Sequence, residues 1–180
     1  MSVYIDPDTP LVNLTTTQLA QLGKQMLGQE KWDRRFLSVA QLVSTWSKDP
    51  STQVGAVVVD RLRQVVGTGF NGFPRGVEDS DERYNDRPTK YAMVVHAELN
   101  AILQAGERAR GGTIYVYPSF GAPSLCSNCA KAVIQSGIIR SVGFEPNVDE
   151  ERAARWAEEL AIASTMCGEA GIKVDLLAEG

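Results

Sequence analysis

The order of strand-like and helix-like segments between residues 54 and 177 is the feature of this sequence that most restricts its fold. Two valine-rich segments, 54–60 and 64–70, are joined by a short polar link, which predicts an antiparallel hairpin. Three further strand-like segments follow, each preceded by a helical pattern: 113–117, 139–144 and 172–177. Strands that alternate with helices are normally parallel, so the sequence predicts a mixed sheet of about five strands.

Helical periodicity in the remaining segments predicts helices on both faces of this sheet. These segments are, in chain order, 15–29, 31–47, 91–105, 127–136 and 149–169. Asp49-Pro50 ends the second helix, because the residue before a proline disfavours helical backbone. The polar segment 71–90, with two prolines and two glycines, is predicted to be a long functional loop. We therefore expect an α/β fold of three layers, α/β/α, with an N-terminal helical extension.

Composition narrows the class of protein. A chain of 180 residues with 43% hydrophobic and 22% charged residues is typical of one globular domain. Its net charge of -4 disfavours binding to nucleic acid through a broad basic surface, but leaves a small anionic ligand open. We expect a cytoplasmic protein with no membrane partner, for three reasons. The sequence has only three cysteines, its acidic N-terminal segment lacks signal-peptide character, and it contains no long apolar segment.

The single histidine and two of the cysteines form a metal-ligand pattern. The histidine lies in the sequence His96-Ala97-Glu98, in the first half of the helix expected at 91–105. Cys126 and Cys129 open another predicted helix and project from one face of its first turn, where the helix dipole favours thiolates. One imidazole and two thiolates suit Zn²⁺ and leave its fourth position open, which is typical of a catalytic site.

The fourth zinc ligand would then be a water molecule, whose pKa zinc lowers from about 15.7 towards 7. Glu98 is not needed as a ligand and is placed to take a proton from this water and return it to a substrate. Together the residues match the H-x-E and P-C-x-x-C signature of zinc deaminases, except that Leu125 replaces the proline. Alone, the CxxC pair could be a redox pair and the histidine a core residue. Cys167 is interpreted as a core residue.

Four segments resemble the family of deoxycytidylate deaminases over roughly residues 30–145. They are SKDPSTQVGAV at 47–57, GFNGFPRG at 69–76, KYAMVVHAELNAI at 90–102 and CSNCAKAVIQSG at 126–137. The first two separate this family from deaminases of free cytidine and of tRNA adenosine. The resemblance implies the cytidine deaminase fold and zinc-dependent hydrolysis of dCMP to dUMP and ammonia, which supplies dUMP for thymidylate synthesis. We expect one domain over 1–180, with an N-terminal extension at 1–29, a catalytic core at 30–145 and a C-terminal helix and strand at 146–180.

The resemblance also implies substrate contacts. It places Asn71 near the sugar of the nucleotide and the corner formed by Ser47 and Lys48 at its 5′-phosphate. Ala97 is carried over as a further substrate contact. From the residues alone, Lys48 could equally be a surface charge and Asn71 a turn residue.

In the same family the loop that here contains Gly72, Phe73 and Arg75 borders an allosteric site between subunits. There dCTP with Mg²⁺ activates and dTTP inhibits. This resemblance therefore implies a homo-oligomer, with a hexamer as the best guess, and an effector site that involves Mg²⁺. Val77 follows the loop where many relatives have cysteine, which leaves regulation an open question.

The segment 117–125 is several residues longer than the corresponding loop of relatives. Because Cys126 holds its end at the zinc, the added residues lie close to the reacting ring, where Tyr117 and Phe120 could form an aromatic wall. A tolerated surface insertion is the alternative.

Two other functions remain open at this stage. One is a deaminase that acts on a different or 5-substituted cytosine nucleotide or on a nucleoside, since the metal chemistry is shared. The other is a zinc-stabilised nucleotide sensor without turnover. Glu98 disfavours the sensor, because a structural zinc site has no use for a proton shuttle.

Overall fold

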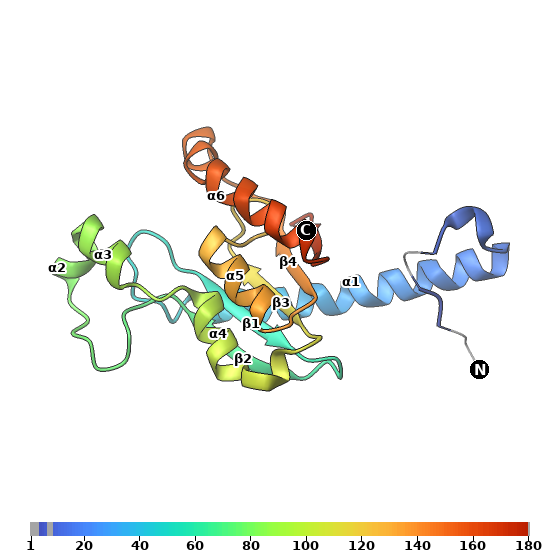
Figure 1. Cartoon of the computed structure of the whole chain (residues 1–180), viewed down its shortest axis with the longest axis horizontal. Helices are drawn as coiled ribbons and strands as arrows, with labels where there is room; N and C mark the ends of the chain where they lie inside the picture. The colour runs from blue at the N-terminus through green and yellow to red at the C-terminus, as the bar shows by residue number, and fades with distance from the viewer. Residues whose placement is uncertain (1–3, 7–8, 180) are drawn as a thin grey trace. The chain divides into compact units, whose positions relative to one another are not determined.

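The computed structural model describes residues 4–6 and 9–179 and contains a five-stranded sheet in the order β2-β1-β3-β4-β5 (Figure 1). The strands are β1 (Gly55–Val59), β2 (Val65–Phe70), β3 (Thr113–Tyr117), β4 (Arg140–Phe144) and β5 (Lys173–Leu177). β1 pairs antiparallel with both β2 and β3, whereas β3, β4 and β5 pair parallel. The predicted hairpin and the mixed sheet of about five strands are confirmed.

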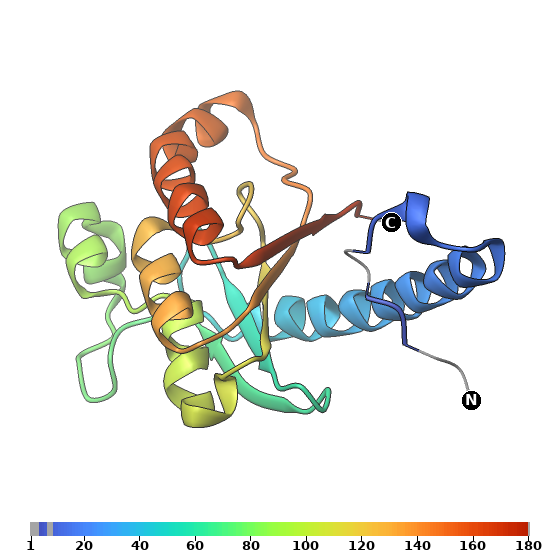
Figure 2. The same cartoon turned by 45° about the vertical axis from the view of Figure 1, so that its right-hand side comes forward.

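Helices cover both faces of the sheet, which confirms the three-layer α/β/α arrangement (Figure 2). The C-terminal part of α1, residues 36–44, lies on one face, where the ring of Phe36 packs 5.1 Å from that of Tyr115. The other face and its helices share one hydrophobic core. These helices are α4 (Ala97–Ala105), α5 (Ser127–Gln135) and α6 (Glu150–Glu169).

Two glycines set how closely the helices approach the hairpin. A Cβ atom at Gly55 would lie 2.1 Å from the carbonyl oxygen of Ala40 in α1. A Cβ atom at Gly69 would lie 2.2 Å from the carbonyl oxygen of Ala97, the first residue of α4. Only glycine permits contacts this close, so Gly69 determines where the N-terminus of α4 meets the sheet.

The N-terminal segment forms one long helix, α1 (Thr16–Ser44), so the prediction of two helices at 15–29 and 31–47 is wrong. No proline interrupts the junction, where Glu30 forms an i,i+4 ion pair of 2.9 Å with Arg34. The chain divides into two compact units between Arg35 and Phe36. In the first unit a 3₁₀ turn, Leu11–Asn13, precedes the helix.

The predicted helix at 91–105 is wrong in one respect, because it is broken just before the histidine. α3 (Arg87–Met93) ends and α4 begins at Ala97, with extended backbone between them. Val95 in this break exchanges backbone hydrogen bonds with Gly72, so pairing with a distant segment replaces the helix. The predicted loop at 71–90 holds the short helix α2 (Asp81–Asn85) and the start of α3, and a 3₁₀ turn, Gly106–Ala109, follows α4.

Within the described part of the chain, none of the helices has the length and apolar character that crossing a membrane requires.

Candidate metal centre and substrate pocket

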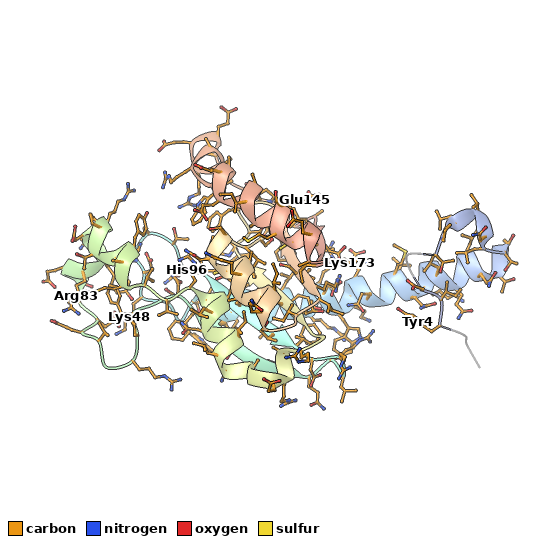
Figure 3. The ribbon with its side chains drawn as sticks, viewed as in Figure 1. Tyr4, Lys48, Arg83, His96, Glu145 and Lys173 are labelled. Carbon is orange, nitrogen blue, oxygen red and sulfur yellow. The ribbon has the colours of Figure 1, made fainter. Side chains whose placement is uncertain are left out.

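The structure brings together the three residues predicted as metal ligands, from the starts of two helices. His96 is the N-cap residue of α4, with extended backbone, and is labelled in Figure 3. Cys126 is the N-cap residue of α5, and its sulfur accepts the backbone N–H of Cys129 at 3.4 Å. The ligand atoms of the three residues all lie within 4.8 Å of one another. His96 therefore precedes its helix and does not lie in the first half of one, as the sequence predicted.

The distances fit a zinc ion. Nδ1 of His96 lies 3.4 Å from Sγ of Cys126 and 3.3 Å from Sγ of Cys129. Tetrahedral zinc with ordinary bond lengths separates a nitrogen ligand from a sulfur ligand by about 3.5 Å. The two sulfurs thus face Nδ1, which identifies it as the ligand atom of the imidazole. Three protein ligands leave one position for a water or substrate.

The three side chains perturb one another strongly. A hydrogen bond from Cys129 and the nearby imidazole lower the pKa of Cys126 to about 4. The Cys126 sulfur in turn raises the pKa of His96 to about 9, and it raises the pKa of the buried Cys129 thiol as well. A metal requires neutral imidazole and two thiolates, so zinc binding here releases protons.

Glu98 lies in the first turn of α4 and is only 6% exposed. Burial raises the pKa of its carboxyl group, while the neighbouring His96 opposes that effect. A carboxyl group whose pKa moves towards neutrality can both accept and return a proton, which is what a general acid–base role requires.

A pocket of about 490 Å³ opens beside this centre, a volume in the ordinary range of small-ligand sites. The predicted residues that line it are Asn71, His96, Ala97, Glu98, Phe120 and Cys126. Cys129 is buried beside them. The structure thus gathers the metal ligands, the candidate acid–base residue and several predicted substrate contacts around one cavity.

Asn71 uses its amide group within the protein. Its Oδ1 accepts the N–H of Val54 at 2.8 Å, and its Nδ2 donates to the carbonyl of Thr52 at 2.9 Å and to Asp49 at 3.2 Å. It therefore holds the loop before β1 in place at the pocket wall.

Ser47 and Lys48 do not line this pocket. The hydroxyl of Ser47 is buried, where it donates to the carbonyl of Asn71 at 2.8 Å. Lys48 forms an exposed ion pair of 2.8 Å with Asp79 and borders an adjoining, shallower hollow. The geometry does not favour the prediction that this corner holds the 5′-phosphate, because the hydroxyl is used internally and the ammonium group is directed towards Asp79.

The sequence interpretation missed a buried ion pair at the pocket wall. Lys90 lies 2.7 Å from Asp49, and the two side chains are 7% and 2% exposed. The Lys90 ammonium group also donates to the hydroxyl of Ser51 at 2.5 Å. Asp49 was interpreted only as a helix stop, and no local pattern indicates that a lysine 41 positions away would pair with it.

The sequence interpretation also missed a wall of the pocket that α6 supplies. Arg152, Arg155, Trp156 and Leu160 line the cavity, and we call them the α6 wall. An amphipathic pattern of this kind is typical of any helix packed on a sheet, so the sequence contained no signal for it.

The loop before Cys126 contributes one aromatic residue to the pocket and not two. Phe120 lines the cavity and stacks on Trp156, with ring centroids 5.2 Å apart and planes at 14°. Tyr117 does not line it; its hydroxyl accepts a hydrogen bond from Gln41 in α1 at 3.2 Å. The predicted wall of Tyr117 and Phe120 is therefore wrong in its first member, which Trp156 replaces.

The predicted allosteric loop is attached to the metal centre through the backbone. Gly72 pairs with Val95, the residue before His96. Phe73 stacks on Tyr84 of α2 with ring centroids 4.5 Å apart, and Arg75 is exposed.

Comparison with known proteins agrees with this geometry. Residues 30–145 match the family model described as "Cytidine and deoxycytidylate deaminase zinc-binding region". An "Uncharacterized deaminase in luxG 3'region" of Aliivibrio fischeri is 43% identical over 149 residues, covering 82% of this chain and 94% of the relative. The deoxycytidylate deaminase of Mus musculus is 41% identical over 140 residues, covering 73% of this chain and 76% of the relative.

Among solved structures, the dCMP deaminase of the cyanophage S-TIM5 in complex with dCMP and dUMP is similar with a TM-score of 0.61. The match covers 82% of this chain and 97% of that protein at 20% sequence identity. At this identity the likeness shows a shared fold.

Proposed function

This chain belongs to the family of cytidine and deoxycytidylate deaminases, and on that premise we propose that it hydrolyses dCMP to dUMP and ammonia. The observation that carries the proposal is the His96, Cys126 and Cys129 triad beside the buried Glu98 on one pocket wall. Relatives of about 40% identity that are named deoxycytidylate deaminases support this substrate over a free nucleoside.

We assign His96, Cys126 and Cys129 to zinc. When bound, zinc acts as a Lewis acid that makes a water molecule nucleophilic at neutral pH. Glu98 accepts a proton from the attacking water and returns it to the pyrimidine, so that water and dCMP become dUMP and ammonia. Ala97 and Phe120 line the cavity and are the proposed contacts to the nucleoside part. Asn71 also lines it, and because its amide group is bonded within the protein, its proposed role is to hold the loop before β1 at the pocket wall beside the sugar.

The test is ammonia release by the zinc-loaded protein from dCMP, CMP, deoxycytidine, dCTP and 5-methyl-dCMP, with and without a chelator. We expect dCMP to be the best substrate and activity to be lost with the metal. Equal turnover of deoxycytidine would favour a nucleoside deaminase. Faster turnover of 5-methyl-dCMP would favour a deaminase of substituted nucleotides. Binding without ammonia release would support a sensor.

We also propose that the chain assembles into a homo-oligomer, specifically a hexamer. We further propose that dCTP with Mg²⁺ activates this assembly and that dTTP inhibits it. The backbone pairing of Gly72 with Val95 supports regulation, because it links the predicted loop to the residue beside His96. Exposed aromatic residues support assembly: Trp46 and Phe70 are 53% and 38% exposed and in edge contact. A monomer in light scattering at micromolar concentration, or activity insensitive to both nucleotides, would contradict these proposals.

A further inference from the structure

The α6 wall lies outside the segment that the family model matches. The family model ends at residue 145, and α6 begins at Glu150. Arg152 nevertheless borders the same cavity as His96 and Glu98. The family model therefore assigns no role to this helix, and we infer its role from the residues that it contributes to the pocket.

Four cationic side chains line the pocket, and they differ in what they contact: Arg87, Lys90, Arg152 and Arg155. Lys90 is committed to Asp49 at 2.7 Å. Arg155 pairs with Glu151 at 3.3 Å. Arg87 is exposed at the start of α3. Arg152 is half-buried and lines both this pocket and the neighbouring hollow, which none of the other three does.

The guanidinium group of Arg152 forms no ion pair with any residue in the ranges 4–6 and 9–179. Its side-chain contact is the ring of Phe120, with the guanidinium carbon 5.9 Å from the ring centroid. The nearby carboxylate of Asp149 caps the helix by accepting the backbone N–H of Arg152 at 2.7 Å. The backbone at this helix start is therefore already satisfied, and the charged group that remains for a ligand is the guanidinium.

Arg152 also faces the hydroxyl-bearing loop before β1. The pocket and the shallower hollow beside it share the residues Asp49, Ser51, Thr52, Pro118 and Arg152. The two cavities therefore meet where α6 approaches this loop. The negative charge of Asp49 is offset there by Lys90, and the Ser51 hydroxyl is used within this cluster, where it donates to Asp49 at 2.9 Å. The meeting point therefore offers an anion the guanidinium of Arg152 and the hydroxyl of Thr52.

We propose that Arg152 recognises the 5′-phosphate of the nucleotide and makes the enzyme prefer a nucleotide to a nucleoside. The inference rests on the proposed function for the identity of the substrate. It replaces the Ser47 and Lys48 corner, whose polar groups are directed elsewhere. A guanidinium suits this task because its planar set of donors matches phosphate oxygens in pairs.

The experiment compares kcat/KM for dCMP and for deoxycytidine in the zinc-loaded wild type and in Arg152→Gln. We expect the variant to lose roughly 10- to 100-fold on dCMP through KM, as expected for a lost charge-assisted hydrogen bond. On deoxycytidine we expect a change of less than about twofold, so that the preference for the nucleotide collapses. Arg152→Lys should recover part of the loss, because it restores charge but not the paired donors. Arg110→Gln, which removes an exposed arginine that does not line the pocket, is the matched control for net charge.

Equal losses on dCMP and deoxycytidine in Arg152→Gln would overturn the proposal, because they would indicate a structural role for this arginine. The proposal would also be overturned if Lys48→Gln or Arg87→Gln lost more kcat/KM specifically on dCMP than Arg152→Gln does.

Calorimetry with dUMP and with inorganic phosphate separates this inference from the proposed function. If Arg152→Gln binds dUMP and inorganic phosphate more weakly than the wild type does, anion recognition by Arg152 is supported even if the wild type fails to deaminate dCMP. Phosphate binding that is unchanged in the variant overturns it whatever the activity.

Discussion

The metal centre and the α6 wall border the same cavity but are held in place by different means. The ligand residues His96 and Cys126 are N-cap residues of two helices that pack into one buried core, so their directions follow from the backbone. Arg152 and Trp156 reach the cavity through half-exposed side chains of a helix beyond the residues that the family model matches. The comparison indicates that rigid elements hold the candidate metal ligands, whereas the proposed phosphate contact comes from partly exposed side chains that can change without disturbing those ligands.

The largest effect is expected at Glu98. Glu98→Gln should retain zinc and lose roughly 10²–10⁴-fold in kcat, because general acid–base steps contribute that much. The measurements are ammonia release and metal content of the purified protein. The exposed Glu107→Gln is the control, since this residue is 93% exposed and does not line the pocket. Turnover near that of the wild type in a correctly metallated Glu98→Gln protein would contradict the assigned role.

Cysteine variants test the metal centre itself. Cys129→Ala should bind much less than one zinc per chain and lose activity, because it removes one of the three ligands. Cys167→Ala is the matched control, since Cys167 is equally buried but lies in α6, outside the triad. Metal analysis decides the matter: stoichiometric zinc in Cys129→Ala, or loss of zinc in Cys167→Ala, would show that the ligand set is wrong.

The buried pair at the pocket wall should contribute to stability more than an exposed pair does. Asp49→Asn leaves the buried Lys90 ammonium group without its carboxylate, and we expect the free energy of unfolding to fall by about 3 kcal/mol. Asp79→Asn, which removes the exposed pair with Lys48, should cost under about 1 kcal/mol. Urea unfolding of both variants measures the difference, and equal losses would contradict it.

The same pair predicts a pH dependence. Burial acts to raise the pKa of Asp49, but the Lys90 ammonium group and the N–H groups of Ser51 and Thr52 lower it below its usual value. Its contribution to stability is therefore present above the unfolded pKa of about 3.9 and is lost as the pH falls through the folded value. Wild type and Asp49→Asn should accordingly converge in stability in acid. A constant gap down to acid pH would show that the charge of Asp49 is not the cause.

The smallest effect is expected where the two regions touch. Glu159 of α6 accepts the N–H of Ser127 at 3.1 Å, at the start of the helix that carries the cysteines. Glu159→Gln should lower the free energy of unfolding by about 0.5–1 kcal/mol, because a carboxylate near a helix N-terminus is favourable. Glu158→Gln, its exposed neighbour, is the control. Thermal unfolding of the two variants should separate them, and identical values would remove this link between α6 and the metal centre.

The metal centre was predictable because each of its residues carries a local signal. The single histidine stands next to Ala-Glu, and the cysteines have the spacing of a helix start. The break before His96 was not predictable, because Val94 and Val95 continue the helical pattern and only pairing with Gly72 interrupts it. The prediction of two separate N-terminal helices was wrong for the opposite reason. No residue at their predicted junction forces a break, so α1 continues through it.

The sequence by itself determined the succession of strands and helices along the chain, the α/β class and the candidate ligand triad. It could do so because hydrophobic periodicity and residue spacing are properties of a few neighbouring residues. Only the tertiary structure decided which charged groups face the cavity. Lys48 pairs with Asp79, and Lys90 pairs with Asp49, which lies 41 positions away in the sequence. Arg152 of α6 lines the cavity beside residues of other helices and loops. The physical reason is that long charged side chains take their direction from partners that are remote in sequence, so their roles exist only once the chain has folded.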